Sequence, residues 1–505
     1  MLLHCRVLRL SVGPFNAGLC SSLRPSVIRS YRSAAGRLQK QQEELFPQRI
    51  ALPENRGYVP MLSPLQVTSI LTLNEASSTD KFPSKGPIRY FNSNQLPSNN
   101  PIEDRRAVGQ LLQTGGTLFG VFDGHGGAAC AQAVSERLFD YVAITILPYD
   151  ALEEYSHYMR TNTPLPILDL YRFRNDYVSD DLVHLYQQSL QKYVVETLSV
   201  SGLEDTEGQF SSIVDQLKSS FLRLDEDISS EAMPVSGTWN EDAISIALSG
   251  SCACVVHVKD LDVHAASVGD CRAVIGRIGP DGGWIAHPLT VDHNTENPKE
   301  SQRVKNSHPK SETSMLFKNS RLLSQLIPLR AFGDVRFKWS AKDLKSLSNL
   351  LGPAYADIIP NHYHTPPYLI ARPEVTNYRL KKNDRFLVVA SDGLWETMPN
   401  EKVVEIVGDH FNGKKTLDEF ASENFGALKL GEINNVLQDR RRGMAHRTTD
   451  DNGATHLMRH ALGYEHRKVS EMLTFPPQIS RFYRDDITIT IVYFDDAYLA
   501  ENAED

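Results

Sequence analysis

The sequence predicts an α+β fold, in which strands and helices both occur but do not alternate regularly along the chain. Between Ala243 and Arg277 the apolar residues follow a period of two, which indicates consecutive strands joined by turns at Lys259-Asp260 and Gly269-Asp270. Helical periodicity occurs in separate segments, such as Ala128–Leu147. Because regular alternation is the pattern of a doubly wound sheet, its absence favours the α+β class.

The expected elements follow from these two periodicities. Strands are continuous or alternating apolar runs that stop at a turn signal, and helices carry apolar residues every three or four positions. In chain order we expect the strand Leu118–Phe122, the helices Ala128–Leu147, Leu182–Leu198 and Ile213–Ile228, the strands Ser251–Val258, Leu261–Ser267, Arg272–Arg277 and Arg385–Ala390, the helix Val403–Phe411 and the strand Ile487–Phe494.

The first forty residues differ in composition from the rest of the chain. They contain seven basic side chains, from Arg6 to Lys40, many serines, and no acidic residue before Glu43. An Arg-rich and Ser-rich segment without acids is typical of a mitochondrial transit peptide, and a basic disordered tail is the alternative. We therefore expect residues 1–40 to direct the protein to the mitochondrial matrix.

Composition shifts also suggest how the rest of the chain is organised. We expect residues 41–91 to form an N-terminal arm with a short helix near Pro64–Ala76, residues 92–495 to form the main domain, and residues 496–505 to form a tail. Polar or irregular stretches predict insertions near 148–181 and 412–475 and a mobile flap near 294–328.

The overall composition excludes several classes of protein. The formal net charge of -9 argues against a nucleic-acid partner, and no uninterrupted apolar run is long enough to span a bilayer. The six cysteines are scattered, which argues against a disulfide framework. Cys252-Ala253-Cys254 lies in a strand pattern without a second ligand pair, so we expect no zinc site there.

Acidic residues beside glycines recur along the chain, and most follow an apolar, strand-like run. These blocks are Asp123-Gly124-His125-Gly126-Gly127, Gly269-Asp270, Gly333-Asp334, Ser391-Asp392-Gly393 and Arg484-Asp485-Asp486. Carboxylates gathered at the ends of strands repel one another unless cations neutralise them. Ligation by oxygen alone suits Mg²⁺ or Mn²⁺, so the blocks predict a two-metal hydrolase.

Five blocks in this order, with Arg330-Ala331-Phe332 preceding the third, resemble the PPM family of metal-dependent serine/threonine phosphatases over roughly residues 92–495. Further stretches resemble one branch of that family, the catalytic subunits of pyruvate dehydrogenase phosphatase. They are Asn94–Pro97, Pro101–Arg106, Gln132–Phe139, Tyr363–Leu369 and Tyr483–Thr488. The resemblance implies a central antiparallel β-sandwich flanked by α-helices, with the metals at one end and insertions at the periphery.

The resemblance also implies roles for individual residues. Asp123 would bridge two Mg²⁺ or Mn²⁺ ions, the Gly124 carbonyl would hold one of them, and Asp392 and Asp485 would complete the pair. Asp104 would act through bound water, and Asp270 with Asp392 would hold a third, weaker ion. His125 would be the general acid for the leaving serine oxygen.

One position departs from the family pattern. Many relatives carry an arginine four residues before the acidic pair Glu103-Asp104, where it grips the substrate phosphate, and here that position is Asn99. Arg105 or Arg106 could substitute. Because Asn99 supplies a hydrogen bond but no charge, we expect weak activity on small free phosphoesters.

The family also implies a substrate and partners. The substrate would be phosphoserine on the α subunit of pyruvate dehydrogenase. The lipoyl domain of dihydrolipoyl acetyltransferase, with Ca²⁺ strengthening the contact, and a regulatory subunit of the phosphatase would be partners. The alternatives are a phosphatase for a different matrix phosphoprotein and a catalytically dead scaffold.

A different phosphatase chemistry also has to be weighed. Cys271 and Arg277 have the spacing of cysteine-dependent phosphatases, but the residues between them alternate as in a strand. That chemistry needs a phosphate-binding loop at a helix N-terminus and a thiolate of low pKa. We therefore expect Cys271 to be a structural residue.

Overall fold

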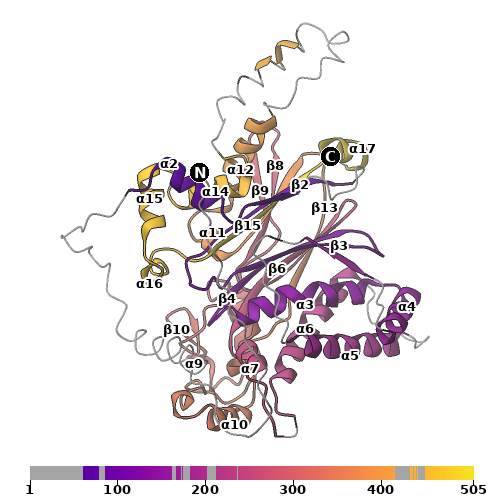
Figure 1. The fold of residues 1–505 in the computed structure, drawn as a ribbon, viewed down its shortest axis with the longest axis vertical. Helices are drawn as coiled ribbons and strands as arrows, with labels where there is room; N and C mark the ends of the chain where they lie inside the picture. The colour runs from indigo at the N-terminus through magenta and orange to yellow at the C-terminus, as the bar shows by residue number, and fades with distance from the viewer. Residues whose placement is uncertain are drawn as a thin grey trace, which may run out of the picture. The chain divides into compact units, whose positions relative to one another are not determined.

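Two antiparallel sheets pack face to face in the part of the chain that this computed structural model describes (Figure 1). The described residues are 61–78, 86–161, 166–171, 173, 182–201, 212–235, 237–415, several positions between 431 and 441, and 450–504. The predicted transit peptide, residues 1–40, lies outside them. No helix among the described residues is long and apolar enough to cross a membrane.

The first sheet runs, in spatial order, through β1 (Ala76–Ser78), β2 (Ile88–Leu96), β15 (Ile487–Phe494), β14 (Asp384–Ala390), β8 (Arg272–Ile278) and β9 (Trp284–Pro288). The second sheet runs through β13 (Glu374–Arg379), β7 (Asp262–Val268), β6 (Gly250–Lys259), β4 (Thr117–His125), β3 (Arg105–Leu111) and β5 (Leu168–Leu170), and β12 (Phe332–Gly333) pairs with β6. The chain crosses between the sheets more than once. For example, the hairpin β6–β7 belongs to the second sheet, and the next strand, β8, belongs to the first.

The side chains between the sheets form a common core. Phe119 and Val121 of β4 pack there with Val389 of β14 and Val492 of β15. Side chains alternate across a strand, so Phe122 of β4 faces the opposite way, into a cluster with the helices. Strand β4 is therefore buried on both faces and reads as a continuous apolar run.

Helices cover the outer face of each sheet (Figure 1). On the side of the second sheet lie α3 (Ala129–Ile146), α4 (Tyr149–Arg160), α5 (Val183–Ser201), α6 (Ile213–Glu231) and α7 (Glu241–Leu248), and α10 (Ala341–Leu351) joins the same apolar cluster at the lower end of the view in Figure 1. On the first sheet lie α2 (Pro64–Leu71), α11 (Asp392–Trp395), α12 (Asn400–Lys415), α14 (Gly453–Ala461) and α15 (His466–Thr474). The predicted α+β class with a central antiparallel sandwich is confirmed.

The remaining elements are short. They are α8 (Pro298–Ser307), α9 (Thr313–Leu316), β10 (Phe317–Lys318), β11 (Arg321–Leu322), the 3-10 helices Val335–Phe337 and Pro353–Tyr355, α16 (Pro477–Ser480) and α17 (Asp496–Asn502). The expected strands and helices are present, with ends that differ by up to five residues.

Several expected boundaries differ from the structure. The boundary at residue 92 falls inside β2, and both β1 and α2 of the expected arm belong to the first sheet and its helix layer. The expected tail forms α17, whose Leu499 is buried against the core. These segments are short and contribute few apolar side chains each, so their periodicity is too weak to read from sequence.

The expected insertions and flap also contain regular structure. Residues 148–181 include α4, and the described end of 412–475 includes α14, which is buried on the first sheet. The segment 294–328 contains α8, α9 and the β10–β11 pair. It is anchored by Glu300, which is 3% exposed and accepts hydrogen bonds from Arg303 and Arg330 at 2.6–2.8 Å.

We expect Glu300→Gln to destabilise the fold by ~3 kcal/mol at pH 7, because it leaves two partly buried arginines without a counter-charge. Burial raises the pKa of Glu300, but the bonds to Arg330 and Arg303 outweigh it and bring the pKa to about 2. The folded pKa lies below the ordinary 4.5, so this stabilisation is present above pH 4.5 and is lost as the pH falls toward 2.

Denaturant unfolding at pH 7 and pH 3 measures this effect. The difference in unfolding free energy between the unmodified chain and Glu300→Gln should be smaller at pH 3 than at pH 7. Glu296→Gln, an exposed position in the same segment, is the control and should change little. Equal losses in the two variants at pH 7 would contradict the anchoring role of Glu300.

Candidate metal centre and active site

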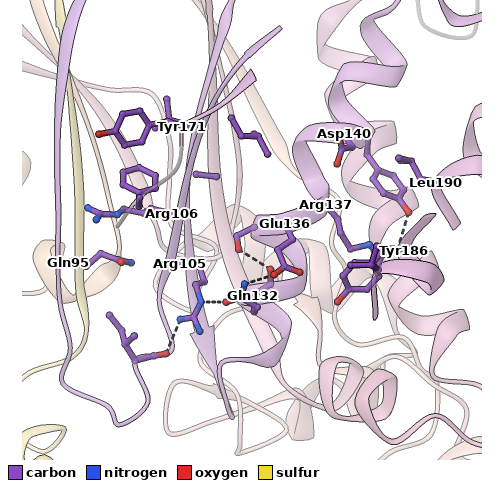
Figure 2. Close-up of a pocket in the computed structure, with 18 of the residues that line it drawn as sticks. Gln95, Arg105, Arg106, Gln132, Glu136, Arg137, Asp140, Tyr171, Tyr186 and Leu190 are labelled. Atoms are coloured by element: carbon purple, nitrogen blue, oxygen red, sulfur yellow. Dashed lines mark hydrogen bonds between the residues drawn. The ribbon is translucent and has the colours of Figure 1, made fainter. Parts of the chain in front are cut away.

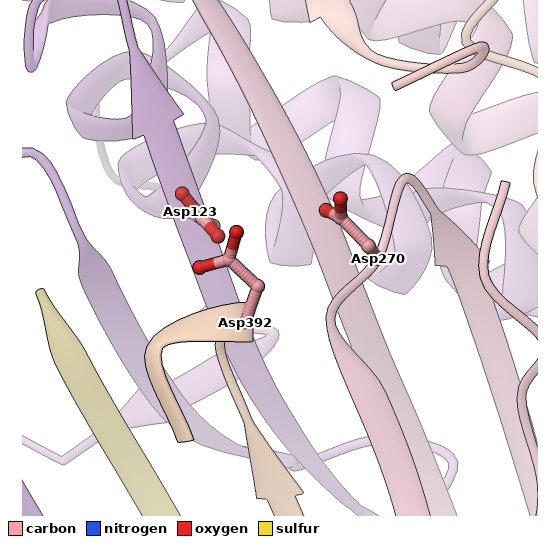
Figure 3. A group of neighbouring side chains, drawn as sticks. All are labelled: Asp123, Asp270 and Asp392. Atoms are coloured by element: carbon pink, nitrogen blue, oxygen red, sulfur yellow. The ribbon is translucent and has the colours of Figure 1, made fainter. Parts of the chain in front are cut away.

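Three carboxylates meet at one end of the sandwich (Figure 3). Asp123 stands near the end of β4, Asp270 lies in the turn between β7 and β8, and Asp392 opens α11 directly after β14. Each side chain offers an oxygen, and these oxygens all lie within 4.8 Å of one another. The residues are half-buried, and they come from both sheets, so only the packed sandwich creates the cluster.

The cluster is electrostatically unfavourable without cations. Burial raises the pKa of Asp123 well above its usual range, and the nearby charge of Asp392 raises it further. Burial likewise raises the pKa of Asp392, with further contributions from Asp270 and Asp485. None of the ion pairs found among the described residues includes a member of the cluster. An all-oxygen set of crowded carboxylates fits Mg²⁺ or Mn²⁺.

Two of the other sequence-predicted ligands border the cluster. Asp104 directly precedes β3 and is buried, and its Oδ2 accepts a hydrogen bond from the Ser391 hydroxyl at 2.7 Å. Burial, followed by the charge of Asp486, raises the pKa of Asp104 to about 8. Asp485 lies just before β15, and its charge acts on Asp123 and Asp392. The structure therefore brings both residues to the same end of the sandwich.

Gly124 has a packing reason to be glycine. A Cβ atom at this position would collide with the backbone carbonyl oxygen of Glu103. The end of β4 can therefore lie against the segment before β3 only without a side chain. This close approach places the backbone of Gly124 against residue 103, which directly precedes Asp104.

His125 is held by a carboxylate that sequence reasoning did not assign to it. Its Nε2 lies 2.6 Å from Oδ2 of Asp334, which is 209 residues away in sequence. Burial favours the neutral imidazole, but the charge and hydrogen bond of Asp334 outweigh this and raise the pKa of His125. The pair favours a protonated histidine beside the carboxylate cluster, and the Gly333-Asp334 block was the only sequence signal for it.

Neighbouring residues fix this pair. A Cβ at Gly250 would overlap both His125 Nε2 and Asp334 Oδ2, so β6 must carry glycine where it passes the pair. Asp334 has a left-handed backbone, with φ of 51°. Asp225 accepts hydrogen bonds from the Gly333 amide at 2.9 Å and from Lys338 Nζ at 2.7 Å, which holds the turn on both sides of Asp334.

Asn99 lies at the edge of the site. Its side-chain amide donates to Asp485 Oδ1 at 3.3 Å and to Asp486 Oδ2 at 3.2 Å. The Asp486 carboxylate also accepts the backbone amides of Ser98, Asn99 and Glu103 at 2.5–2.8 Å. Asp486 therefore organises the loop that carries Asn99, a role that the sequence did not reveal.

Arg105 does not reach the carboxylates. It lies opposite Phe122, so it shares the helix-covered face of the second sheet, whereas the neighbouring positions 104 and 123 face the other way. Its guanidinium donates to Gln132 and to the carbonyl oxygens of Ile102 and Asp104.

Arg105 lines a cavity with Gln132, Glu136 and Tyr186 (Figure 2), and the volume of this cavity is about 520 Å³. Arg106 also lines this cavity, and it donates to Ser93 and to the carbonyl of Asn74. The structure thus brings neither arginine to the position of the expected phosphate grip.

Cysteine-dependent chemistry is excluded by the same structure. The residues after Cys271 form β8, not a phosphate-binding loop. Cys271 is a free thiol, 1% exposed, and burial raises its pKa well above the usual range. The expectation that it is structural is confirmed.

Comparisons with known proteins indicate the family of this chain. A family model described as protein phosphatase 2C matches residues 180–427. The mitochondrial pyruvate dehydrogenase (acetyl-transferring) phosphatase 1 of Homo sapiens is 45% identical over 451 residues, which cover 86% of this chain and 83% of that protein. The mitochondrial pyruvate dehydrogenase (acetyl-transferring) phosphatase 2 of Homo sapiens is 40% identical over 454 residues, which cover 86% of this chain and 83% of that protein.

A solved structure, serine-threonine phosphatase 2C from Toxoplasma gondii, has a TM-score of 0.40 and 17% identity, and the match covers 83% of this chain and 99% of that one.

Proposed function

Because this chain belongs to the protein phosphatase 2C family, in the branch of the mitochondrial pyruvate dehydrogenase phosphatases, we propose that it dephosphorylates phosphoserine on the pyruvate dehydrogenase α subunit. This reaction reactivates the decarboxylase component in the mitochondrial matrix. The observation that carries the proposal is the cluster of Asp123, Asp270 and Asp392, whose charges require cations. A scaffold without activity has no use for mutually repelling carboxylates, which disfavours the dead-scaffold alternative.

The proposed ligand set is the one that the family implies. Asp123, the Gly124 carbonyl, Asp392 and Asp485 would hold two ions of Mg²⁺ or Mn²⁺, and Asp270 with Asp392 would hold a third. Asp104, which is held by Ser391, would act through water. When bound, such ions lower the pKa of a shared water and offset charge on the phosphoryl oxygens.

The chain itself supplies the proton for the leaving group. Asp334 binds His125 Nε2, which leaves the other ring nitrogen, Nδ1, to donate to the serine oxygen. The raised pKa favours the protonated imidazole, which is the form that a general acid requires. A serine alkoxide is a poor leaving group, so this proton transfer contributes most with alkyl phosphoesters.

Two further contacts are proposed from the family resemblance alone. One is docking on the lipoyl domain of dihydrolipoyl acetyltransferase, strengthened by Ca²⁺. The other is association with a regulatory subunit of the phosphatase. Both would concentrate the enzyme on its substrate complex.

The test is phosphate release from phosphorylated pyruvate dehydrogenase complex by the full chain. We expect release with Mg²⁺, none with excess chelator, and an increase with micromolar Ca²⁺ if lipoyl docking occurs. Release from a generic phosphoserine peptide, but not from the complex, would retain the chemistry and favour a different matrix phosphoprotein. Release that persists in chelator would contradict the metal mechanism.

A further inference from the structure

The site leaves one requirement of phosphate recognition unmet. A phosphoserine carries nearly two negative charges at neutral pH, and a guanidinium can bind two of its oxygens together. The expected position for that arginine is Asn99, which has no charge, and Arg105 is held on the far face of the second sheet. Another cation at the edge of the metal centre would add the charge that Asn99 lacks.

The last residue of α16 and the segment after it are tied to the loop that carries Asn99. The hydroxyl of Ser480 donates to the Ser98 carbonyl at 2.5 Å, and the hydroxyl of Ser98 donates to the Arg484 carbonyl at 2.6 Å. Asp486, two residues further on, binds three backbone amides of the same loop. Residues 480–486 and 98–103 therefore form one edge of the site, which we call the Asn99 rim.

Arg481 is the accessible cation of the Asn99 rim. Its side chain is exposed, and it makes no hydrogen bond or ion pair with any described residue. Its charge nevertheless acts on the site. Burial raises the pKa of Glu103 and of Asp485, and the charge of Arg481 opposes both shifts. Arg481 directly follows Ser480, whose hydroxyl is bonded to the Ser98 carbonyl, so the backbone places Arg481 at the rim.

Arg484 is less suited to this role. Its Nε and Nη1 are buried and unpaired among the described residues, and burial lowers its pKa. It is also the residue whose carbonyl anchors Ser98, so its position is set by the backbone of the rim. Arg481 has the freedom of an exposed side chain to turn toward an incoming phosphate.

We propose that Arg481 binds the phosphate of the phosphoserine substrate, in place of the arginine that Asn99 replaces. The proposal rests on the proposed function, because it assigns a residue to substrate binding at the same site. The ligand is a phosphate monoester dianion presented at the Asn99 rim. Asn99 keeps the carboxylates in place and Arg481 supplies the charge.

The experiment compares the full chain with Arg481→Gln, Arg481→Lys and the control Arg467→Gln. Arg467 is an exposed arginine of α15 that makes no hydrogen bond or ion pair with described residues. The first measurement is the KM for a phosphoserine peptide in Mg²⁺. The second is the Kd for inorganic phosphate by calorimetry, which needs no turnover. Thermal unfolding checks that each variant is folded.

We expect Arg481→Gln to raise both the KM and the phosphate Kd about tenfold, the usual size of a lost hydrogen bond to a charged group. Arg481→Lys should recover part of the loss, and Arg467→Gln should match the unmodified chain. Equal phosphate Kd values for Arg481→Gln and Arg467→Gln would overturn the proposal. An unmodified chain without peptide activity would remove the proposed function, while the phosphate Kd would still decide the role of Arg481.

Discussion

Asp392→Asn is expected to reduce phosphoserine hydrolysis by at least about 10³-fold, which corresponds to ~4 kcal/mol of activation free energy. Asp392 belongs to the cluster of three carboxylates, and an amide cannot neutralise a divalent ion as a carboxylate does. Asp123→Asn should cause a similar loss for the same reason. The measurement is kcat with a phosphoserine peptide across a range of Mg²⁺ concentrations.

The same variant should have the opposite effect on stability. In metal-free solution Asp392→Asn removes one of the charges that repel each other, so its Tm should exceed that of the unmodified chain. Added Mg²⁺ should raise the Tm of the unmodified chain more than that of the variant, since a ligand stabilises the state that binds it. This opposite effect separates loss of a metal ligand from general misfolding.

The control is Asp357→Asn, an exposed aspartate that makes no hydrogen bond or ion pair with described residues. It should leave both turnover and Tm unchanged. Near-normal turnover in Asp392→Asn would remove the two-metal assignment.

The second large effect is expected from His125→Ala, which should slow hydrolysis of a phosphoserine peptide about a hundredfold, the usual contribution of a general acid. An aryl phosphate should lose much less, because a phenolate leaves without a proton. The comparison of kcat for the two substrates separates a proton donor from a residue that only shapes the site.

Asp334→Asn tests the pair from its other side. Asparagine can keep a hydrogen bond to Nε2, but it removes the charge that raises the pKa of His125. Like His125→Ala, Asp334→Asn should slow hydrolysis of the phosphoserine peptide more than hydrolysis of the aryl phosphate. The loss of kcat should be smaller than in His125→Ala. Gly250→Ala should also separate the pair, because its Cβ occupies the space between the two side chains.

Equal losses on the two substrates in His125→Ala would remove the general-acid role. If Asp334→Asn lost kcat equally on the two substrates while His125→Ala did not, Asp334 would only pack against the site and would not support the proton transfer.

The sequence by itself determined the fold class, the family and the carboxylates that gather at the metal centre. Strand periodicity is local, and an aspartate beside a glycine after an apolar run marks a strand end. Asp123 and Asp392 could therefore be predicted from short windows, and β15 matches its expected bounds, Ile487–Phe494. The branch of the family followed from stretches such as Tyr363–Leu369, which are again local.

Only the tertiary structure decided which side chains meet. His125 and Asp334 are 209 residues apart, and Ser98 and Ser480 are 382 apart. Arg105 was a reasonable candidate in sequence, but strand pairing turns it to the helix-covered face. Such contacts depend on register and on how strands pass between the two sheets. No local pattern records either, because the free energy that fixes them comes from burial between segments distant in sequence.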